Sequence, residues 1–201
     1  MEDDVRVIAG EFKGRRLKAP EGMGTRPTID RVKESVVSSI YSARGGLDDA
    51  VVLDAFAGSG GLGIECLSRG AKTALFYEYD RKAQRALREN IDMLKLQAGR
   101  ARIVQSDVLK RPPTVVAMPF DVVLLDPPYA YDLQVIVDFL RTLRDAKALA
   151  DGAIVSYEHD SSCALAPVLE RSGLDMDILT TKRFGGTTID ICRIACPDEE
   201  E

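Results

Sequence analysis

The chain has 201 residues, which corresponds to one domain of ordinary size with at most a small appendage. Hydrophobic residues make up 45% and charged residues 29%, which excludes an acidic disordered chain, and no apolar run approaches the roughly 20 residues that span a bilayer. The net charge is −5, and the acidic N-terminus Met-Glu-Asp-Asp leads into no apolar segment typical of a secretion signal, so a cytoplasmic location is expected.

Basic residues are concentrated near the N-terminus. Residues 5–33 contain eight basic and three acidic residues, a local charge of +5, so the rest of the chain sums to −10. A positive segment on an acidic body favours a polyanionic partner at that end, although a merely solvated face would have the same composition. The basic residues are Arg6, Lys13, Arg15, Arg16, Lys18, Arg26, Arg31 and Lys33.

A small hairpin and a helix are predicted first. Residues 5–19 have the pattern of two short strands joined by a turn. Thr28 is placed to cap a helix over residues 29–42, in which apolar residues recur at helical spacing, and Gly45 follows as its end. The chain is accordingly divided into an N-terminal hairpin and helix (residues 1–44), a main domain (45–196) and an acidic tail (197–201).

Strands and helices alternate from residue 50 onward. This alternation predicts an α/β fold with a seven-stranded, mostly parallel sheet and helices on both faces. The strand at 120–126 is the most apolar and is expected at the centre, and Gly185 with Gly186 indicates a closing antiparallel hairpin. The strands are predicted over 51–56, 73–78, 101–107, 120–126, 153–158, 176–184 and 187–194, and the helices over 61–69, 81–97, 132–146 and 163–172.

A glycine-rich loop follows the first strand of the main domain. Gly58 to Gly63 matches G-x-G-x-x-G, whose glycines allow a sharp turn and a close approach of a ligand to the helix N-terminus. The motif alone is weak, because a purely structural strand-to-helix turn has the same pattern. Since open α/β sheets bind ligands at the carboxyl ends of their strands, this loop is a candidate cofactor site. Its candidate residues are Phe56, Gly58, Ser59, Gly60 and Gly61.

Acidic residues end three successive strands. Asp54 disfavours a pyrophosphate and favours a cationic group, such as the amine of an amino-acid-like cofactor. Glu78 can accept hydrogen bonds from two ribose hydroxyls, and Asp107 is placed to accept one from an adenine amino group. Tyr79 is a candidate to lie against the adenine. Any one acid could instead be a helix cap, but together they fit S-adenosylmethionine better than NAD.

The fourth strand ends in Asp126-Pro127-Pro128-Tyr129, the candidate catalytic segment. The exocyclic amine of a nucleobase is a poor nucleophile, and a site activates it by accepting its hydrogens. The Asp126 carboxylate and the Pro127 carbonyl are suited to do this, because the prolines stiffen the backbone that carries that carbonyl. Tyr129 offers a ring on which the base can stack. The alternative interpretation is a rigid strand stop without chemistry.

No metal site is expected. Cys66, Cys163, Cys192 and Cys196 contain no C-x-x-C pair, and His159 is the single histidine of the sequence.

These motifs resemble the RsmD-type family of bacterial 16S ribosomal RNA guanine-N2 methyltransferases, which have the Rossmann-like class I methyltransferase fold. The resemblance covers nearly the whole chain and is most specific in the Arg-Pro-Thr and Asp-Arg-Val-Lys-Glu block. Asp-Pro-Pro-Tyr is shared with adenine-N6 enzymes and does not name the base. The matching segments are 6–10, 13–15, 25–28, 30–34, 56–63, 67–70, Asn90, 126–129 and 184–185.

The resemblance implies methyl transfer from S-adenosylmethionine to the N2 amine of one guanine in 16S rRNA, either naked or in an assembling small subunit. The glycine loop with Asp54, Glu78 and Asp107 would hold the cofactor, and residues 126–129 the guanine, turned out of its stack. The positive N-terminal segment would bind the RNA backbone beside the pocket. Two alternatives stay open, an adenine-N6 methyltransferase and a non-catalytic ribosome-assembly protein. Nothing in the sequence demands more than a monomer.

Overall fold

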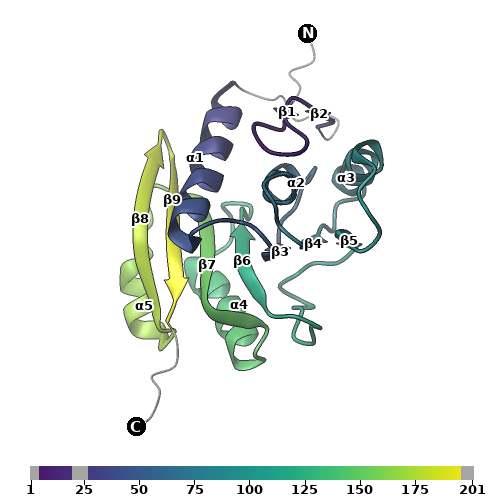
Figure 1. Cartoon of the computed structure of the whole chain (residues 1–201). Helices are drawn as coiled ribbons and strands as arrows, with labels where there is room; N and C mark the ends of the chain where they lie inside the picture. Colours follow the sequence, from purple (N-terminus) through teal and green to yellow (C-terminus); the bar gives the residue numbers. More distant parts are fainter. Residues whose placement is uncertain (1–4, 20–26, 196–201) are drawn as a thin grey trace.

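The protein is described by a computed structural model for residues 5–19 and 27–195 (Figure 1). Short strands and a long helix come first, followed by alternating strands and helices. The strands are β1 (Val5–Arg6), β2 (Arg16–Leu17), β3 (Val51–Asp54), β4 (Thr73–Tyr77), β5 (Ala101–Val104), β6 (Phe120–Leu125), β7 (Leu149–Asp160), β8 (Met176–Phe184) and β9 (Thr187–Ile194). The helices are α1 (Pro27–Arg44), α2 (Gly61–Ser68), α3 (Arg81–Leu94), α4 (Leu133–Asp145) and α5 (Ala166–Ser172).

The main sheet has seven strands in the order β5-β4-β3-β6-β7-β9-β8. The strands from β5 to β7 pair in parallel, whereas β9 runs antiparallel to both β7 and β8. The most apolar strand, β6, is the fourth of the seven. The predicted sheet, its central strand and its closing antiparallel hairpin are therefore confirmed.

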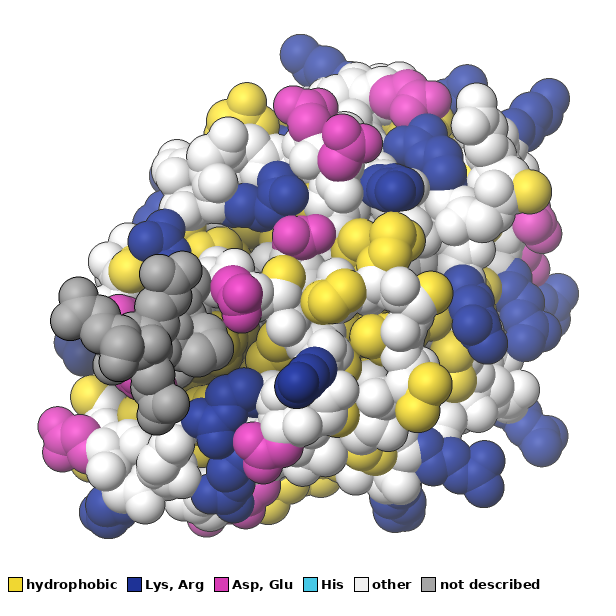
Figure 2. Space-filling view, turned by 60° about the horizontal axis from the view of Figure 1, so that its bottom comes forward, with side chains coloured by type: hydrophobic (Ala, Val, Ile, Leu, Met, Phe, Trp, Pro, Cys, Tyr) yellow, Lys and Arg dark blue, Asp and Glu magenta, His cyan; other side chains and the backbone are white. Residues whose placement is uncertain are grey.

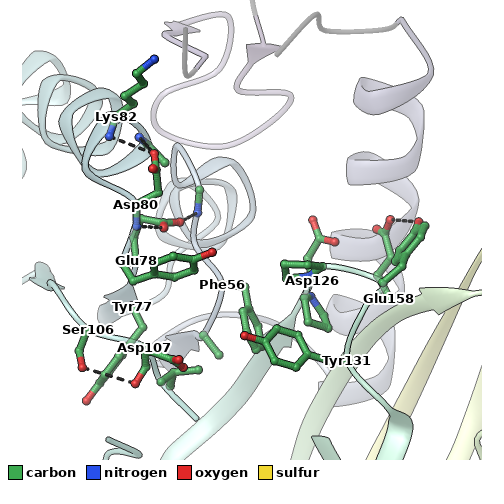
Figure 3. A pocket seen from close by; sticks show the side chains of 18 residues that line it. Phe56, Tyr77, Glu78, Asp80, Lys82, Ser106, Asp107, Asp126, Tyr131 and Glu158 are labelled. Carbon is green, nitrogen blue, oxygen red and sulfur yellow. Dashed lines mark hydrogen bonds between the residues drawn. The ribbon is translucent and has the colours of Figure 1, made fainter. Parts of the chain in front are cut away.

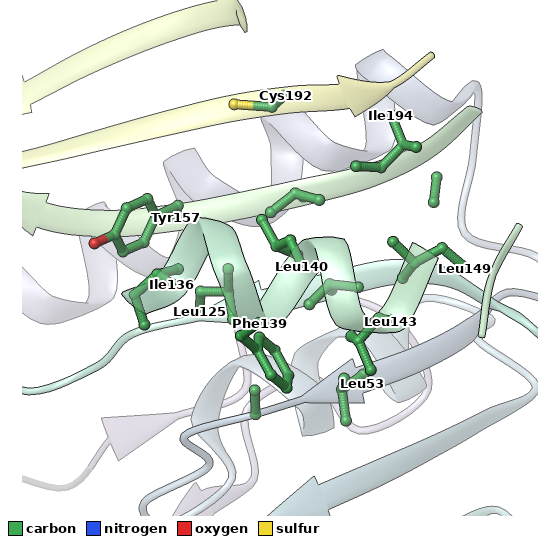
Figure 4. Close-up of a cluster of buried hydrophobic side chains, with 14 of the residues drawn as sticks. Leu53, Leu125, Ile136, Phe139, Leu140, Leu143, Leu149, Tyr157, Cys192 and Ile194 are labelled. Carbon is green, nitrogen blue, oxygen red and sulfur yellow. The ribbon is translucent and has the colours of Figure 1, made fainter. Parts of the chain in front are cut away.

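Helices cover both faces of this sheet. On one face, α4 and α5 bury side chains such as Ile136 and Leu169 against Leu53, Leu125 and Tyr157 of the strands (Figure 4). On the other face, α1, α2 and α3 cover a second buried cluster. Alternate residues of β3 and β6 point to opposite clusters, as the pleat of a strand buried on both faces requires.

Several predicted boundaries were wrong by a few residues. The helix predicted to reach residue 97 ends at Leu94, because Lys95 adopts a left-handed conformation (φ 51°). The strand predicted from residue 153 begins at Leu149, which pairs with Phe120 across an irregularity in the ladder. Helix α1 begins at Pro27, one residue before the predicted cap Thr28.

The N-terminal hairpin packs on helix α2. The carboxylate of Glu65 accepts the backbone N–H groups of Ile8 and Ala9 at 2.9 and 3.0 Å, and the Ser68 hydroxyl accepts that of Phe12 at 2.9 Å. Phe12 belongs to the same buried cluster as α2. The hairpin thus shares the core of the main domain, and the division at residues 44 and 45 stays a prediction.

Within the described ranges, no helix has both the length and the apolar character needed to cross a lipid bilayer.

Candidate active site

A pocket of about 710 Å³ lies over the carboxyl ends of β3 to β7. The glycine loop, the acidic strand ends and the Asp-Pro-Pro-Tyr segment therefore meet in space, although they are far apart in the sequence. Glu78 and Asp107 lie on one side of the pocket and Asp126 on the other (Figure 3). The predicted site residues that line it are Phe56, Gly58, Glu78, Tyr79, Asp107, Asp126, Pro127, Pro128 and Tyr129.

The glycine loop turns sharply from β3 into α2. Gly60 caps the helix with φ 86°, a left-handed conformation that favours glycine. A Cβ atom on Gly63 would come within 2.4 Å of the Phe76 ring, so this glycine allows α2 to pack closely on the sheet. The Ser59 carbonyl accepts a hydrogen bond from Asn90 at 2.9 Å. Ser59, Gly60 and Gly61 are not part of the pocket lining, and their cofactor role stays a prediction.

Asp54 lies beneath the loop and does not line the pocket. Its side chain is buried, and its Oδ2 accepts the Gly63 backbone N–H at 3.0 Å. Burial raises the pKa of Asp54 to about 7, and the nearby Glu78 carboxylate adds to the rise against the effect of the Gly63 hydrogen bond. The structure thus places Asp54 where it holds the loop to helix α2, and direct contact with a cofactor stays a prediction.

Glu78 holds the loop from the other side. Its Oε2 accepts the Gly58 backbone N–H at 2.8 Å, and its Oε1 accepts that of Asp80 at 2.7 Å. Burial raises the pKa of Glu78, and these backbone hydrogen bonds act in the opposite direction. The carboxylate is thereby oriented at the pocket wall (Figure 3), where its remaining lone pairs can accept hydrogen bonds from a ligand.

Two aromatic rings and Asp107 also line the pocket, with the rings between Asp107 and Asp126 in Figure 3. The Phe56 and Tyr131 rings are tilted against each other with centroids 6.2 Å apart. Asp107 Oδ1 accepts the Leu109 backbone N–H at 3.0 Å. Strand β5 ends at Val104, three residues before the predicted end at Asp107. This half offers apolar ring faces and carboxylate acceptors, a combination that suits a purine nucleoside.

Asp126 stands at the end of β6, and its side chain is accessible from the open pocket. Protein surrounds it on the other sides, and this desolvation, with the Glu158 and Asp54 carboxylates nearby, raises the pKa of Asp126 to about 8. The ionised form of Asp126 is therefore disfavoured in the free protein. A ligand that donates hydrogen bonds to it would favour the ionised form.

The rest of the Asp-Pro-Pro-Tyr segment forms a tight turn. The Pro128 carbonyl accepts the Tyr131 backbone N–H at 3.1 Å. Tyr129 is about half exposed (51%), and its hydroxyl lies 3.1 Å from Glu158 Oε1 and 2.5 Å from Thr187 Oγ1. The ring is thus held at the pocket by its hydroxyl, and its predicted stacking role stays a prediction.

Glu158, Tyr131 and Lys82 also line the pocket and were not among the predicted residues. Glu158 ends the strand that was predicted over 153–158, so the rule that placed the other acids at strand ends could have found it. Tyr131 and Lys82 lie in or next to helix starts, where the sequence has no signal that separates a pocket residue from a surface residue.

The predicted RNA-binding residues divide into exposed and buried ones. Lys33 is buried, with its side chain only 4% exposed, and its amine lies 3.8 Å from Glu65 Oε2 and donates to the Arg6 carbonyl, so its RNA-binding role stays a prediction that this burial disfavours. Lys18 is exposed but forms a 2.7 Å ion pair with Glu89. Arg26 lies outside the described residues. The remaining five are exposed: Arg6, Lys13, Arg15, Arg16 and Arg31.

The residues present fit an adenosine-containing cofactor. The pocket combines apolar rings with the Glu78 and Asp107 carboxylates on one side and a second acidic wall on the other, and a cationic ligand group would relieve that excess of negative charge. Within the described part of the chain, no group of His, Cys, Asp and Glu side chains is arranged to hold a metal ion.

Residues 5–193 match the protein family described as Conserved hypothetical protein 95. The chain is 37% identical over 167 residues to ribosomal RNA small subunit methyltransferase D of Escherichia coli (strain K12), covering 82% of this chain and 79% of that protein. It is 40% identical over 133 residues to the Haemophilus influenzae protein of the same name, covering 65% and 66%. The solved structure of Escherichia coli yhhF is similar, with a TM-score of 0.76, 30% identity, and coverage of 96% of this chain and 99% of that one.

Proposed function

The chain belongs to the family described as Conserved hypothetical protein 95, the family of small-subunit rRNA methyltransferase D, and we propose on this premise that it methylates the N2 amine of a guanine in small-subunit rRNA. It is an S-adenosylmethionine-dependent methyltransferase with the predicted Rossmann-like fold. One observation carries the proposal. Asp126 and Pro127 open into the same pocket as the wall of Glu78 and Asp107 that suits adenosine, so a target amine and a methyl donor would meet there.

The chain's own residues would hold the cofactor and orient the target amine. S-adenosylmethionine, when bound, supplies an electrophilic methyl group on a sulfonium. Glu78 and Asp107 would hold its adenosine part by accepting hydrogen bonds. The Asp126 carboxylate and the Pro127 carbonyl would each accept one amine hydrogen and so direct the nitrogen lone pair toward the methyl carbon. Most of the rate acceleration then comes from positioning and electrostatics, with no covalent enzyme intermediate.

Tyr129 would contribute to binding of the base. Its ring is accessible at the pocket and its hydroxyl is held by Glu158 and Thr187. A base that has left its stack recovers about 1–3 kcal/mol by stacking on such a ring.

The exposed basic residues of the N-terminal hairpin would bind the RNA backbone. The hairpin lies at the same end of the molecule as the carboxyl end of β6 (Figure 1), and the residues that follow β6 line the pocket. Figure 2 shows the molecule turned so that the bottom of Figure 1 comes forward. On this face, basic and acidic side chains are mixed. Arg15 and Arg16 are the first candidates, because both are exposed. An rRNA substrate also supports a cytoplasmic location, where small subunits assemble.

The decisive test is to disrupt the gene for this chain and compare the modified nucleosides of purified small-subunit rRNA by chromatography and mass spectrometry. Loss of one N2-methylguanosine, restored by the wild-type gene but not by a gene carrying Asp126→Asn, is expected. Loss of an N6-methyladenosine instead would make the chain an adenine enzyme. An unchanged nucleoside content would favour a non-catalytic assembly role.

A further inference from the structure

Glu158 lies beside Asp126 at the pocket. In the proposed reaction Asp126 accepts a hydrogen of the target amine, whereas Glu158 has no role in base recognition. Strands β6 and β7 pair in parallel with Leu125 opposite Tyr157, and the next residue on each strand is Asp126 and Glu158. Residues at matching positions of neighbouring parallel strands point to the same side of the sheet. Both carboxylates accordingly line the pocket and stand next to each other in Figure 3.

Two neighbouring ionised carboxylates repel each other, and either a proton on one of them or a ligand that donates hydrogen bonds to both relieves the repulsion. Burial raises the pKa of Glu158, and burial together with the Glu158 charge raises the pKa of Asp126. Such a pair is unfavourable for the free protein, so its placement at the pocket points to a ligand with two adjacent donor groups rather than to a gain in stability.

The Glu158 side chain is held in place by its neighbours. The Tyr129 hydroxyl donates to Glu158 Oε1 at 3.1 Å and lies 2.5 Å from Thr187 Oγ1. One carboxylate oxygen is therefore engaged by the protein, and Oε2 retains its full capacity to accept a hydrogen bond from a ligand. The same contact joins Glu158 to the ring on which the base is proposed to stack.

The edges of the four RNA bases differ in the group beside the exocyclic amine. In guanine the 2-amine lies next to the N1–H group, so two donors stand side by side. In adenine and cytosine the ring nitrogen next to the amine is an acceptor, which a carboxylate repels, and uracil has no exocyclic amine. A row of two carboxylates therefore matches guanine alone among the standard bases.

We infer that Glu158 is a specificity-determining residue that accepts the N1–H of the target guanine while Asp126 accepts its 2-amine. This inference rests on the proposed function and adds a physical reason for the choice of guanine over adenine.

The test compares guanine with 2-aminopurine, which keeps the 2-amine but has an acceptor in place of N1–H. Small-subunit rRNA from cells that lack the gene is first methylated by the purified protein, and the position of the new methyl group is mapped. RNA carrying either base at that position, as a fragment or in reconstituted subunits, is then methylated by wild-type protein and by Glu158→Gln. We expect the wild type to prefer guanine by about tenfold or more in kcat/KM. In Glu158→Gln this preference should fall by about tenfold, because the amide can donate to the acceptor of 2-aminopurine.

Two further variants control this measurement. Asp160→Asn removes a carboxylate on the same strand that bonds Ser162 and does not line the pocket, and it should keep the wild-type preference. Glu158→Asp keeps a carboxylate and should stay closer to the wild type than Glu158→Gln does. The 6-oxo group, which 2-aminopurine also lacks, affects all variants alike and cancels when their preferences are compared.

The outcomes separate the inference from the proposed function. If the wild type methylates guanine and Glu158→Gln keeps the full preference over 2-aminopurine, the role of Glu158 is wrong while the proposed function stands. If the wild type transfers no methyl group to guanine, the proposed function fails and the inference fails with it.

Discussion

Lys33 and Glu65 form an ion pair whose side chains are 4% and 0% exposed, with 3.8 Å between the Lys33 amine and Glu65 Oε2. Glu65 also accepts the backbone N–H groups of Ile8 and Ala9 and pairs with Arg69 at 3.0 Å. One buried carboxylate therefore joins the N-terminal hairpin, helix α1 and helix α2. Lys33, although it lies in the most basic segment of the sequence, thus contacts the protein's own buried groups.

The first prediction concerns this buried pair. Glu65→Ala should lower the free energy of unfolding by about 3–5 kcal/mol, because it removes the carboxylate beside the buried Lys33 amine and the acceptor of two backbone N–H groups. Urea denaturation measures the change. Glu89→Ala removes a partner of the exposed Arg85 and should leave the midpoint nearly unchanged. Equal effects of the two substitutions would contradict the structural role of Glu65.

The second prediction concerns the ionisation of Asp126. The ionised carboxylate is a stronger hydrogen-bond acceptor for the amine than the protonated carboxyl group, and the pKa of Asp126 is raised to about 8. The value of kcat/KM should therefore rise with pH and level off above about pH 8. Glu158→Gln should move the midpoint to lower pH, because it removes a neighbouring negative charge. Asp126→Asn should cost about 10²–10³ in turnover and abolish this pH dependence. A wild-type profile that is flat between pH 6 and 9 would remove Asp126 from this role.

A third prediction separates cofactor binding from turnover. Glu78→Ala should weaken the binding of S-adenosylmethionine about tenfold or more, since it removes a ligand acceptor and the carboxylate that holds the Gly58 backbone N–H. Isothermal titration calorimetry measures this affinity. The matched variant Asp126→Asn should bind the cofactor with nearly wild-type affinity while losing turnover. If Asp126→Asn weakens cofactor binding and Glu78→Ala does not, the cofactor binds on the Asp126 side of the pocket and the assignment of the two sides is wrong.

The fourth prediction concerns the contribution of the buried Asp54 to the pH dependence of protein stability. Its pKa is raised from 3.8 to about 7 in the folded protein. The resulting stabilisation is fully present below about pH 4 and is lost as the pH rises through 7. The free energy of unfolding should fall less between pH 5 and pH 8 in Asp54→Asn than in the wild type. The exposed Asp151→Asn should follow the wild-type dependence. Parallel curves for Asp54→Asn and the wild type would show that Asp54 ionises normally.

The last prediction concerns the RNA surface. Replacing Arg15 and Arg16 with Gln should weaken RNA binding and lower the slope of log K against log salt by up to about 0.7–0.9 for each lost phosphate contact. Lys147→Gln with Arg171→Gln is the charge-matched control, because these exposed residues precede strands β7 and β8 at their amino ends, away from the pocket. If the control pair changes the slope and the hairpin pair does not, the RNA-binding surface lies elsewhere.

Much of the fold could be predicted because its signals are local. Apolar runs, glycine turns and helical spacing lie within a few residues of each other, and they indicated the seven strands, their mostly parallel arrangement and the central place of β6. Element ends were less accurate, because they depend on contacts that no local pattern contains. Lys95 ends α3 through a left-handed conformation, and Leu149 extends β7 by pairing with Phe120.

The sequence alone determined which chemistry the strand ends carry, because each of Glu78, Asp107 and Asp126 follows an apolar run that any parallel sheet would direct to the same edge. Only the tertiary structure decided which charged groups become neighbours. Strand order and register place Glu158 beside Asp126, and the packing of α1 on α2 buries Lys33 against Glu65. The physical reason is that hydrophobic periodicity specifies which face of an element is buried, whereas the partner across that face is chosen by packing between segments distant in the chain.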